Sequence, residues 1–145
     1  MTQTLTPEGA IKHANLGWDG SAWHKLPMMF GWSDTYAEQI SSLTMPAGNS
    51  SLNGSIVPAG EVWVVNGLSV AVTSTSCTNI IVVYAIVGAN LVLGEQFAPV
   101  NGRYYLFTPG FVMKAGQYAY ARFYGMTLND NAFVNLWGYK MKVAE

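Results

Sequence analysis

The sequence predicts an all-β domain, a jelly-roll-like β-sandwich that follows an extended N-terminal arm. From Ile56 onward, apolar segments of strand length are separated by regularly spaced Gly, Pro and Asn residues, which is the pattern of a sandwich or barrel. Half of the 145 residues are hydrophobic, so packing alone can build a core without disulfide or metal. The length fits one domain, with the arm at residues 1–55 and the body at residues 56–145.

Strands are expected in the body wherever β-branched and aromatic residues cluster between turn residues. These strands lie near residues 61–73, 79–88, 91–97, 103–108, 116–124 and 132–143. Gly88, Ala89 and Asn90 would close a hairpin between two of them. The last strand alternates between two faces, and Lys140 and Lys142 predict that one face is solvated along its second half.

The arm has no sustained period of a helix or a strand, yet it is dense in large aromatic residues. A solvated tail would not retain these rings, so we expect them to be buried against a partner. Asp19 and Gly20 predict a two-residue type I′ hairpin turn that would place Leu16 across from Trp23. The residues expected to make arm contacts are Trp18, Asp19, Gly20, Trp23, Phe30 and Trp32.

Two segments lie near the expected end of the arm. Residues 33–43 (SDTYAEQISSL) suit either one short helical stretch, with Tyr36 and Ile40 on one face, or an irregular strand. Residues 44–55 (TMPAGNSSLNGS) are polar and rich in Gly and Ser. The second segment is therefore the predicted joint between arm and body.

Charge is scarce along the whole chain. Charged residues make up 10% of it, against about 25% in an average soluble domain. A subunit of an obligate assembly hides much of its surface, so we interpret the low charge as a sign of assembly. The alternative is a β-rich extracellular domain with a Ser, Thr and Asn surface.

The charge pattern also bears on partners and location. The seven basic residues are scattered and the net charge is −1, which argues against nucleic acid as a partner. The apolar runs are too short to cross a membrane as helices, and the first residues lack the features of a secretory signal. We therefore expect a soluble protein without a membrane partner.

The sequence contains no constellation that predicts catalysis. His13 and His24 are its two histidines, and neither has further ligands at metal-binding spacing. It contains neither a G-x-S-x-G motif nor a phosphate-cradling loop. Cys77 is the single cysteine, so no intrachain disulfide can form. We therefore expect neither an enzyme nor a metal or other cofactor.

The aromatic residues of the body are more informative, because several fall on both parities of one strand and cannot all face one core. Tyr118, Tyr120 and Arg122 share one face of the expected strand at 116–124. Such a face is typical of interface hot spots, but it also suits a sugar-binding platform or plain core packing. Together with Trp137, these residues form the interface expected on the body.

Three segments carry a resemblance to a known family: GWDGSAWHKLP in the arm, VPAGEVWVV at the start of the body and LWGYKMKV at its end. With them the chain resembles small virion proteins of tailed bacteriophages, of the capsid decoration (cement or auxiliary) kind. The resemblance implies a β-sandwich that forms a homotrimer on the outer capsid surface of the virion. It implies an arm that reaches over neighbouring subunits, with Trp18, Asp19, Gly20 and Trp23 as its motif.

The residues and the resemblance favour the same hypothesis. The chain would be a decoration protein that binds the major capsid protein or another virion subunit and stabilises the shell through many joined contacts. The competing hypothesis is a carbohydrate- or receptor-binding module of a virion tail or fibre. In that case Tyr118, Tyr120 or Trp137 would be the stacking platforms.

Overall fold

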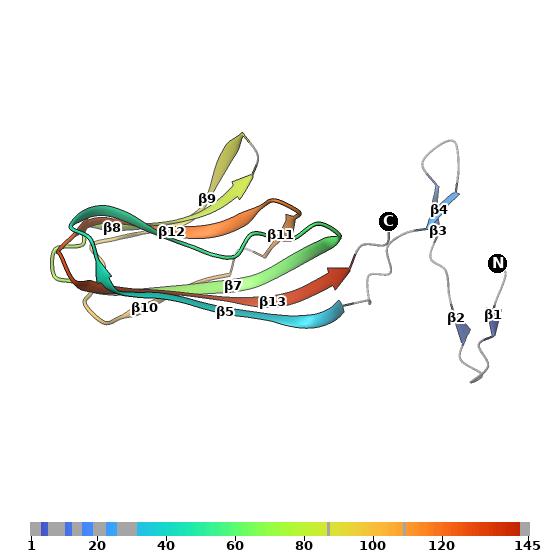
Figure 1. Cartoon of the computed structure of the whole chain (residues 1–145), viewed down its shortest axis with the longest axis horizontal. Coiled ribbons are helices and arrows are strands. Elements are labelled where there is room, and N and C mark those ends of the chain that lie inside the picture. The colour runs from blue at the N-terminus through green and yellow to red at the C-terminus, as the bar shows by residue number, and fades with distance from the viewer. Residues whose placement is uncertain are drawn as a thin grey trace.

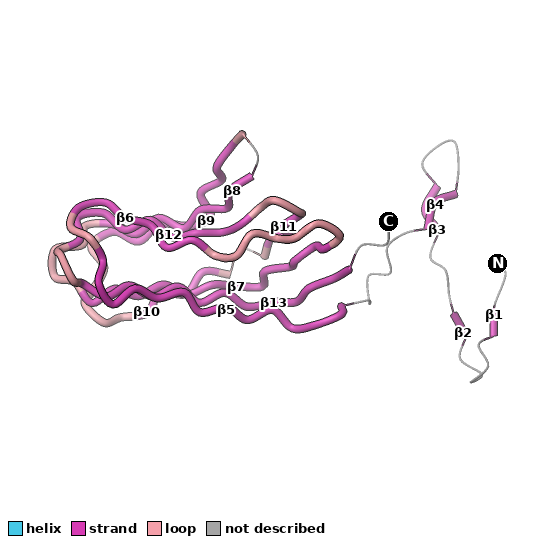
Figure 2. The backbone as a smooth tube through the Cα atoms, viewed as in Figure 1, coloured by secondary structure: helices cyan, strands magenta, loops and turns pink. Residues whose placement is uncertain are grey.

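The computed structural model describes residues 34–86, 88–108 and 110–142 in full, and for strand residues 4–5, 11–12, 16–18, 23–25 and 32–33 it describes the backbone alone. The described body is a sandwich of two antiparallel sheets, and the described residues contain no helix (Figure 1). The all-β sandwich predicted from the sequence is confirmed. Short loops join the strands at the two ends of the sandwich (Figure 2).

The strands of the body are β5 (Trp32–Met45), β6 (Gly48–Asn53), β7 (Glu61–Thr73), β8 (Asn79–Ile86), β9 (Ala89–Phe97), β10 (Tyr104–Phe107), β11 (Phe111–Lys114), β12 (Tyr118–Met126) and β13 (Asp130–Lys142). They are preceded by the short strands β1 (Thr4–Leu5), β2 (Ile11–Lys12), β3 (Leu16–Trp18) and β4 (Trp23–Lys25). β1 pairs with β2, and β3 pairs with β4.

The strand order is that of a jelly roll. The large sheet, as we call it, has the order β10-β7-β13-β5, and β11 also pairs with β7. The small sheet has the order β6-β12-β8-β9. From β5 to β8 the chain changes sheet at every connection, so strands far apart in the sequence become neighbours, as in the two Greek keys of a jelly roll.

The core fills the space between the inner faces of the two sheets, to which alternate residues of each strand point. The large sheet contributes Leu68 and Leu136, and the small sheet contributes Ile80 and Phe123. All four side chains are almost fully buried. Burial of a side chain of this size contributes about 1.5–3 kcal/mol, so the packed sheets can hold the fold without a disulfide or a metal.

Strand β5 corrects the predicted domain boundary. It pairs with β13 along its length, and β6 pairs with β12, so the sandwich begins at β5 and the predicted arm ending at residue 55 is too long. Residues 33–43 form a strand. This strand was hard to recognise because its inner face mixes the apolar Tyr36 and Ile40 with the polar Glu38, which interrupts the alternation.

The other expected strands are confirmed, with shifts at their ends. β7 spans residues 61–73 as predicted, and β8, β9, β10, β12 and β13 lie within about two residues of the prediction, a usual uncertainty for strand ends. β6 and β11 were not predicted. Both are short and lie among glycines, prolines and polar residues, so turn signals outweigh their few apolar residues.

The second half of β13 differs from the prediction of a solvated lysine face. The Lys140 Nζ lies 4.3 Å from the ring centroid of Trp63 and 5.5 Å from that of Tyr36. Both rings belong to the core, so Lys140 points to the inner side of the large sheet. Its aliphatic stem packs there, and the two ring faces stabilise the ammonium group.

Candidate functional site

The outer face of the small sheet brings together three of the residues predicted for the body interface. On β12, Phe123 and the alanines beside Arg122 and Tyr120 point to the core, while Tyr118, Tyr120 and Arg122 point outward. The ring centroids of Tyr118 and Tyr120 are 5.9 Å apart. The Arg122 Cζ lies 5.9 Å from the Tyr120 centroid, and its Nε donates to Ser51 Oγ at 3.4 Å.

These rings cover a small hydrophobic cluster on the outside of the sandwich. Val83 and Ala85 lie directly across from Tyr120 and Tyr118 on β8, and both are buried. Cross-strand pairs of this kind are the unit of sheet stabilisation. The cluster therefore forms without the help of a third layer.

Apolar surface continues from this cluster toward the edge of the small sheet. Val92 on β9 pairs with Val83, and Phe97 pairs with Asn79. The two side chains are 63% and 66% exposed, so a ring and a branched aliphatic group of the outer face meet solvent. We call this surface the Tyr face; its members are Tyr118, Tyr120, Arg122, Ile81, Val83, Ala85, Val92, Glu95 and Phe97.

Two charged side chains lie on the Tyr face: Arg122 beside Tyr120, and the exposed Glu95, which pairs with Ile81 and accepts a hydrogen bond from Asn79. A hydrogen bond with Tyr124 raises the pKa of Arg122 further above its ordinary value, and the Tyr120 hydroxyl adds to the effect. The guanidinium therefore stays protonated at any physiological pH. It can donate to a carboxylate or carbonyl group of a partner while it stacks on Tyr120.

Trp137, the fourth residue predicted for the body interface, lies on the opposite side of the sandwich. It belongs to β13, where Val134 and Leu136 point to the core and Trp137 points outward from the large sheet. Trp137 therefore does not share a surface with Tyr118, Tyr120 and Arg122. Sequence parity assigns residues to a face of their own strand, but it does not reveal that β12 and β13 belong to different sheets.

The indole of Trp137 lies against the backbone of β7. Trp137 pairs with Gly67, and a Cβ atom at Gly67 would sit 2.5 Å from Trp137 Cζ2. Only glycine leaves room for the ring in this position. On the other side, Trp137 pairs with Ala37 of β5, so both neighbours across the sheet are small and the outward ring face is open.

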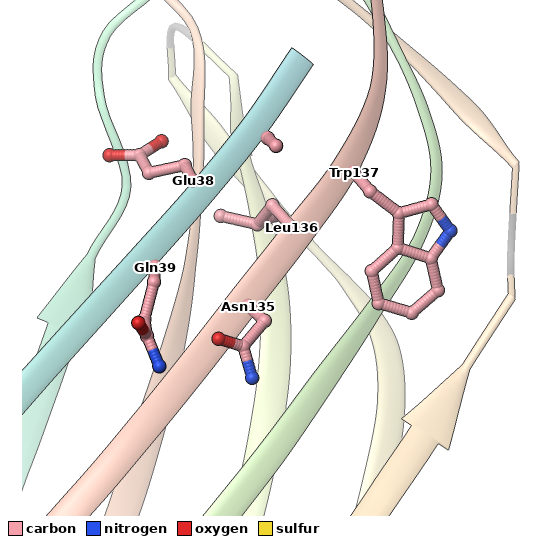
Figure 3. A pocket seen from close by; sticks show the side chains of 6 residues that line it. Glu38, Gln39, Asn135, Leu136 and Trp137 are labelled. Carbon is pink, nitrogen blue, oxygen red and sulfur yellow. The ribbon is translucent and has the colours of Figure 1, made fainter. Parts of the chain in front are cut away.

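A row of polar side chains runs beside this tryptophan. Asn135 pairs with Gln39 on β5 and with Ser69 on β7, and the Asn135 Nδ2 donates to Ser69 Oγ at 3.1 Å. A shallow groove lies between this row and the indole (Figure 3). We call the outer surface of the large sheet the Trp face.

The rest of the Trp face combines apolar residues with exposed hydroxyl groups, such as those of Thr35 and Ser41. Its exposed or half-buried apolar members are Tyr104, Leu106, Val112, Phe133, Tyr139 and Met141. Within the fully described strands of the large sheet, the one charged residue that alternation places on this face is Lys114, at its end, across from Val62. The Trp face thus offers aromatic rings, amides and hydroxyls in a neutral surrounding.

The residues predicted for the arm interface lie almost entirely beyond what the structure describes. β3 and β4 form a hairpin in which Trp18 pairs with Trp23 and Leu16 with Lys25, so the predicted register, with Leu16 across from Trp23, is wrong. Asp19, Gly20 and Phe30 lie outside the described residues, as do the side chains of Trp18, Trp23 and Trp32. Trp32 begins β5 and so belongs to the large sheet.

Among the residues that the structure describes, no three His, Cys, Asp or Glu side chains gather where they could hold a metal ion. The described chain also contains no helix with the length and hydropathy needed to span a bilayer.

No protein-family model and no curated protein matches the chain. Solved structures resemble it at 12% identity. The Drosophila NLP core, described for pentamer formation and histone binding, matches over 76% of this chain and 100% of its own, with a TM-score of 0.38. A CBM4 carbohydrate-binding module matches over 79% and 92%, with a TM-score of 0.25. A structure of infectious bursal disease virus matches over 99% and 47%, with a TM-score of 0.31.

The groove beside Trp137 was not predicted from the sequence. The alternation of Asn135 and Trp137 along the last expected strand was a usable signal, because it puts an amide and a ring on one face. Gln39 could not be predicted as part of the groove, because it lies in a segment that was not recognised as a strand. Gly67 could not be predicted as the residue under the Trp137 ring, because this contact depends on the register of β7 against β13.

Proposed function

We propose that this chain acts by binding, as a decoration subunit on the outer surface of a tailed-bacteriophage capsid. The observation that carries the proposal is the Tyr face. It combines two neighbouring tyrosine rings and an arginine with an apolar cluster and exposed apolar residues, on a sheet that no other described element covers. Tyr and Arg are enriched at binding hot spots, and soluble monomers seldom expose large apolar patches.

Exposed apolar residues and Arg122 are the groups of this face that can contribute binding energy. Full burial of Phe97 and Val92 would contribute about 1.5–3 kcal/mol each. A partner carboxylate that pairs with Arg122 in a dry contact adds a charge-assisted hydrogen bond, worth about 1.5–3 kcal/mol. These gains also have to offset the entropy lost on association, so one face gives moderate affinity.

Moderate affinity becomes firm attachment when copies are joined. We propose a homo-oligomer, a trimer by the family resemblance, in which several Tyr faces engage the major capsid protein together. Removal then requires several contacts to break at once. The arm, with Trp18 and Trp23, would add contact area across a subunit boundary and so help to hold the shell together.

The test is attachment to capsid particles that lack the chain. Tyr120→Ala and Arg122→Ala should each lower retention in co-sedimentation at least about tenfold, the size of a moderate hot spot. Tyr104→Ala, an exposed tyrosine of the opposite face, is the matched control and should keep retention. Normal retention of both Tyr-face variants, in molecules with unchanged melting, would refute this assignment of the face.

A second function is favoured by a separate observation. The indole of Trp137 beside the amides of Asn135 and Gln39 suits a carbohydrate ligand. The jelly roll is used by capsid proteins and by lectins alike, so the fold leaves both functions open.

A further inference from the structure

Trp137 presents a flat platform to solvent. One face of its indole packs on the backbone at Gly67, and the ring is half-buried. The residues directly beside it on the neighbouring strands, Gly67 and Ala37, have no side chain or a single methyl group. The outward face of the indole is therefore unobstructed and held in one orientation by the sheet.

The polar residues Gln39, Asn135 and Ser69 form a row beside the Trp137 indole, close to any ligand ring that stacks on it. Asn135 is two residues from Trp137 on the same strand, a separation of about 6.6–6.8 Å. Gln39 and Ser69 flank Asn135 on the adjacent strands, each about 4.8 Å away. Figure 3 shows the amides of Asn135 and Gln39 on the same side of the sheet as the indole but pointing away from it, so a glycan stacked on Trp137 has to extend along the sheet to reach them.

The groove carries no free carboxylate to attract a cation or repel an anion. Glu38 is one of its lining residues, but its carboxylate accepts hydrogen bonds from the Tyr36 hydroxyl at 2.6 Å and from the Ser55 backbone N–H and hydroxyl at 3.0 and 2.8 Å. Lys114 lies across from Val62, in the row of Met141, about 13 Å along the sheet from Trp137. Glu38 pairs with the core residue Leu136, so its charge lies on the inner side of the large sheet, and the side chains that line the outer side of the groove are uncharged.

We propose that this groove binds a neutral pyranose unit of a glycan. One face of a pyranose ring carries C–H groups whose partial positive charge suits the negative face of an aromatic quadrupole, so the sugar stacks on Trp137. Side-chain amides offer a donor and an acceptor side by side, which matches two neighbouring sugar hydroxyls. Asn135, already oriented by Ser69, and Gln39 supply these groups.

The site is independent of capsid attachment. The Trp face and the Tyr face are on opposite sides of the sandwich, so a subunit held through its Tyr face would leave the Trp face outward. Glycan binding by the isolated chain therefore tests this proposal alone, and retention on particles tests the other.

The experiment titrates the full-length chain with neutral oligosaccharides of α-linked glucose, β-linked glucose and N-acetylglucosamine, and with an oligosaccharide of uronic acids. Tryptophan fluorescence and calorimetry report binding. We expect saturable binding of at least one neutral oligosaccharide. Trp137→Ala should weaken it by about tenfold or more, as loss of an aromatic stacking partner does, and Asn135→Ala by about fivefold, as loss of a hydrogen bond does.

Two controls keep the test decisive. Tyr104→Ala removes a ring of the same face outside the groove and should leave the affinity unchanged. Trp137→Tyr keeps a flat ring, so it should recover part of the binding if Trp137→Ala fails to fold. Three results would overturn the proposal: absence of neutral-glycan binding at millimolar concentration, preference for the uronic acid oligosaccharide, or a change of oligomeric state in Trp137→Ala, which would make the Trp face an interface between copies.

Discussion

Two truncations test whether β5 belongs to the sandwich. Removal of residues 1–31 takes away β1 to β4, which pair only with one another among the described strands. Removal of residues 1–50 also takes away β5 and half of β6. We expect the first truncation to keep a cooperative unfolding transition and the second to abolish it.

The expected loss follows from the pairing of β5. Eleven residue pairs join β5 to β13. An antiparallel ladder makes about one backbone hydrogen bond per pair, and each contributes about 0.5–1.5 kcal/mol net, so the ladder contributes roughly 5–15 kcal/mol. The buried side chains of Tyr36 and Met45 are lost in addition. Since a native domain has about 5–15 kcal/mol of stability in total, the longer truncation removes most or all of it.

Circular dichroism and urea titration measure the outcome. The chain lacking residues 1–31 should show a single cooperative transition with the same β-type spectrum as the full chain. The chain lacking residues 1–50 should be unfolded, molten or insoluble. A cooperative melt after the longer truncation would mean that β13 does not need its β5 partner, and the reasoning from the ladder would be wrong.

Three further predictions follow from packing and from charge. Phe123→Ala should lower the free energy of unfolding in urea by about 3–5 kcal/mol, whereas the exposed Phe97→Ala should change it by no more than about 0.5 kcal/mol; equal effects would contradict the assigned faces. Gly138→Ala should lower the melting temperature sharply, because the added methyl group would overlap the β7 backbone, and normal melting would contradict this close approach. Burial, aided by the nearby carboxylate that accepts its hydrogen bond, raises the pKa of Tyr36 well above its ordinary value. In the unfolded chain the Tyr36 hydroxyl loses its proton at about pH 10, whereas in the folded chain it keeps it. The contribution of this hydroxyl to the stability of the fold is therefore full below that pH and is lost as the pH rises further. Melting at about pH 8 and about pH 11 should therefore show a smaller alkaline loss in Tyr36→Phe than in the exposed control Tyr104→Phe, and equal losses would contradict it.

The strands that could be predicted from the sequence are those whose pattern is local. β7 and β8 are rich in β-branched residues, and the turn residues Gly88 and Asn90 separate β8 from β9, so their positions follow from composition and turn chemistry. β5 could not be predicted in the same way. Its inner positions alternate between a core ring and the polar Glu38, whose carboxylate satisfies the Ser55 backbone more than a dozen residues away. Such a position looks solvated until the tertiary contact is known.

The candidate site shows the same division between local and tertiary information. That Tyr118, Tyr120 and Arg122 share a face follows from alternation within one strand, and the structure places them together. Trp137 was grouped with them because its ring also lacked an obvious core position. The topology of the whole chain decides which sheet a strand joins. Sequence periodicity therefore could not predict that Trp137 and the tyrosines lie on different sheets.

Three of the few charged residues, Glu38, Glu61 and Lys140, lie at the rim of the core and not on an outer face of a sheet. The Glu61 carboxylate accepts a hydrogen bond from Trp63 Nε1 at 2.6 Å, and Lys140 stacks on the rings of Trp63 and Tyr36. Glu38 is held by Tyr36 and Ser55. These charged side chains therefore lie at the edge of the core, where they satisfy polar groups of half-buried side chains. The outer faces still carry Arg122 and Glu95 on the small sheet and Lys114 on the large sheet, so they are sparsely charged, which supports the proposal that they bind partners or ligands.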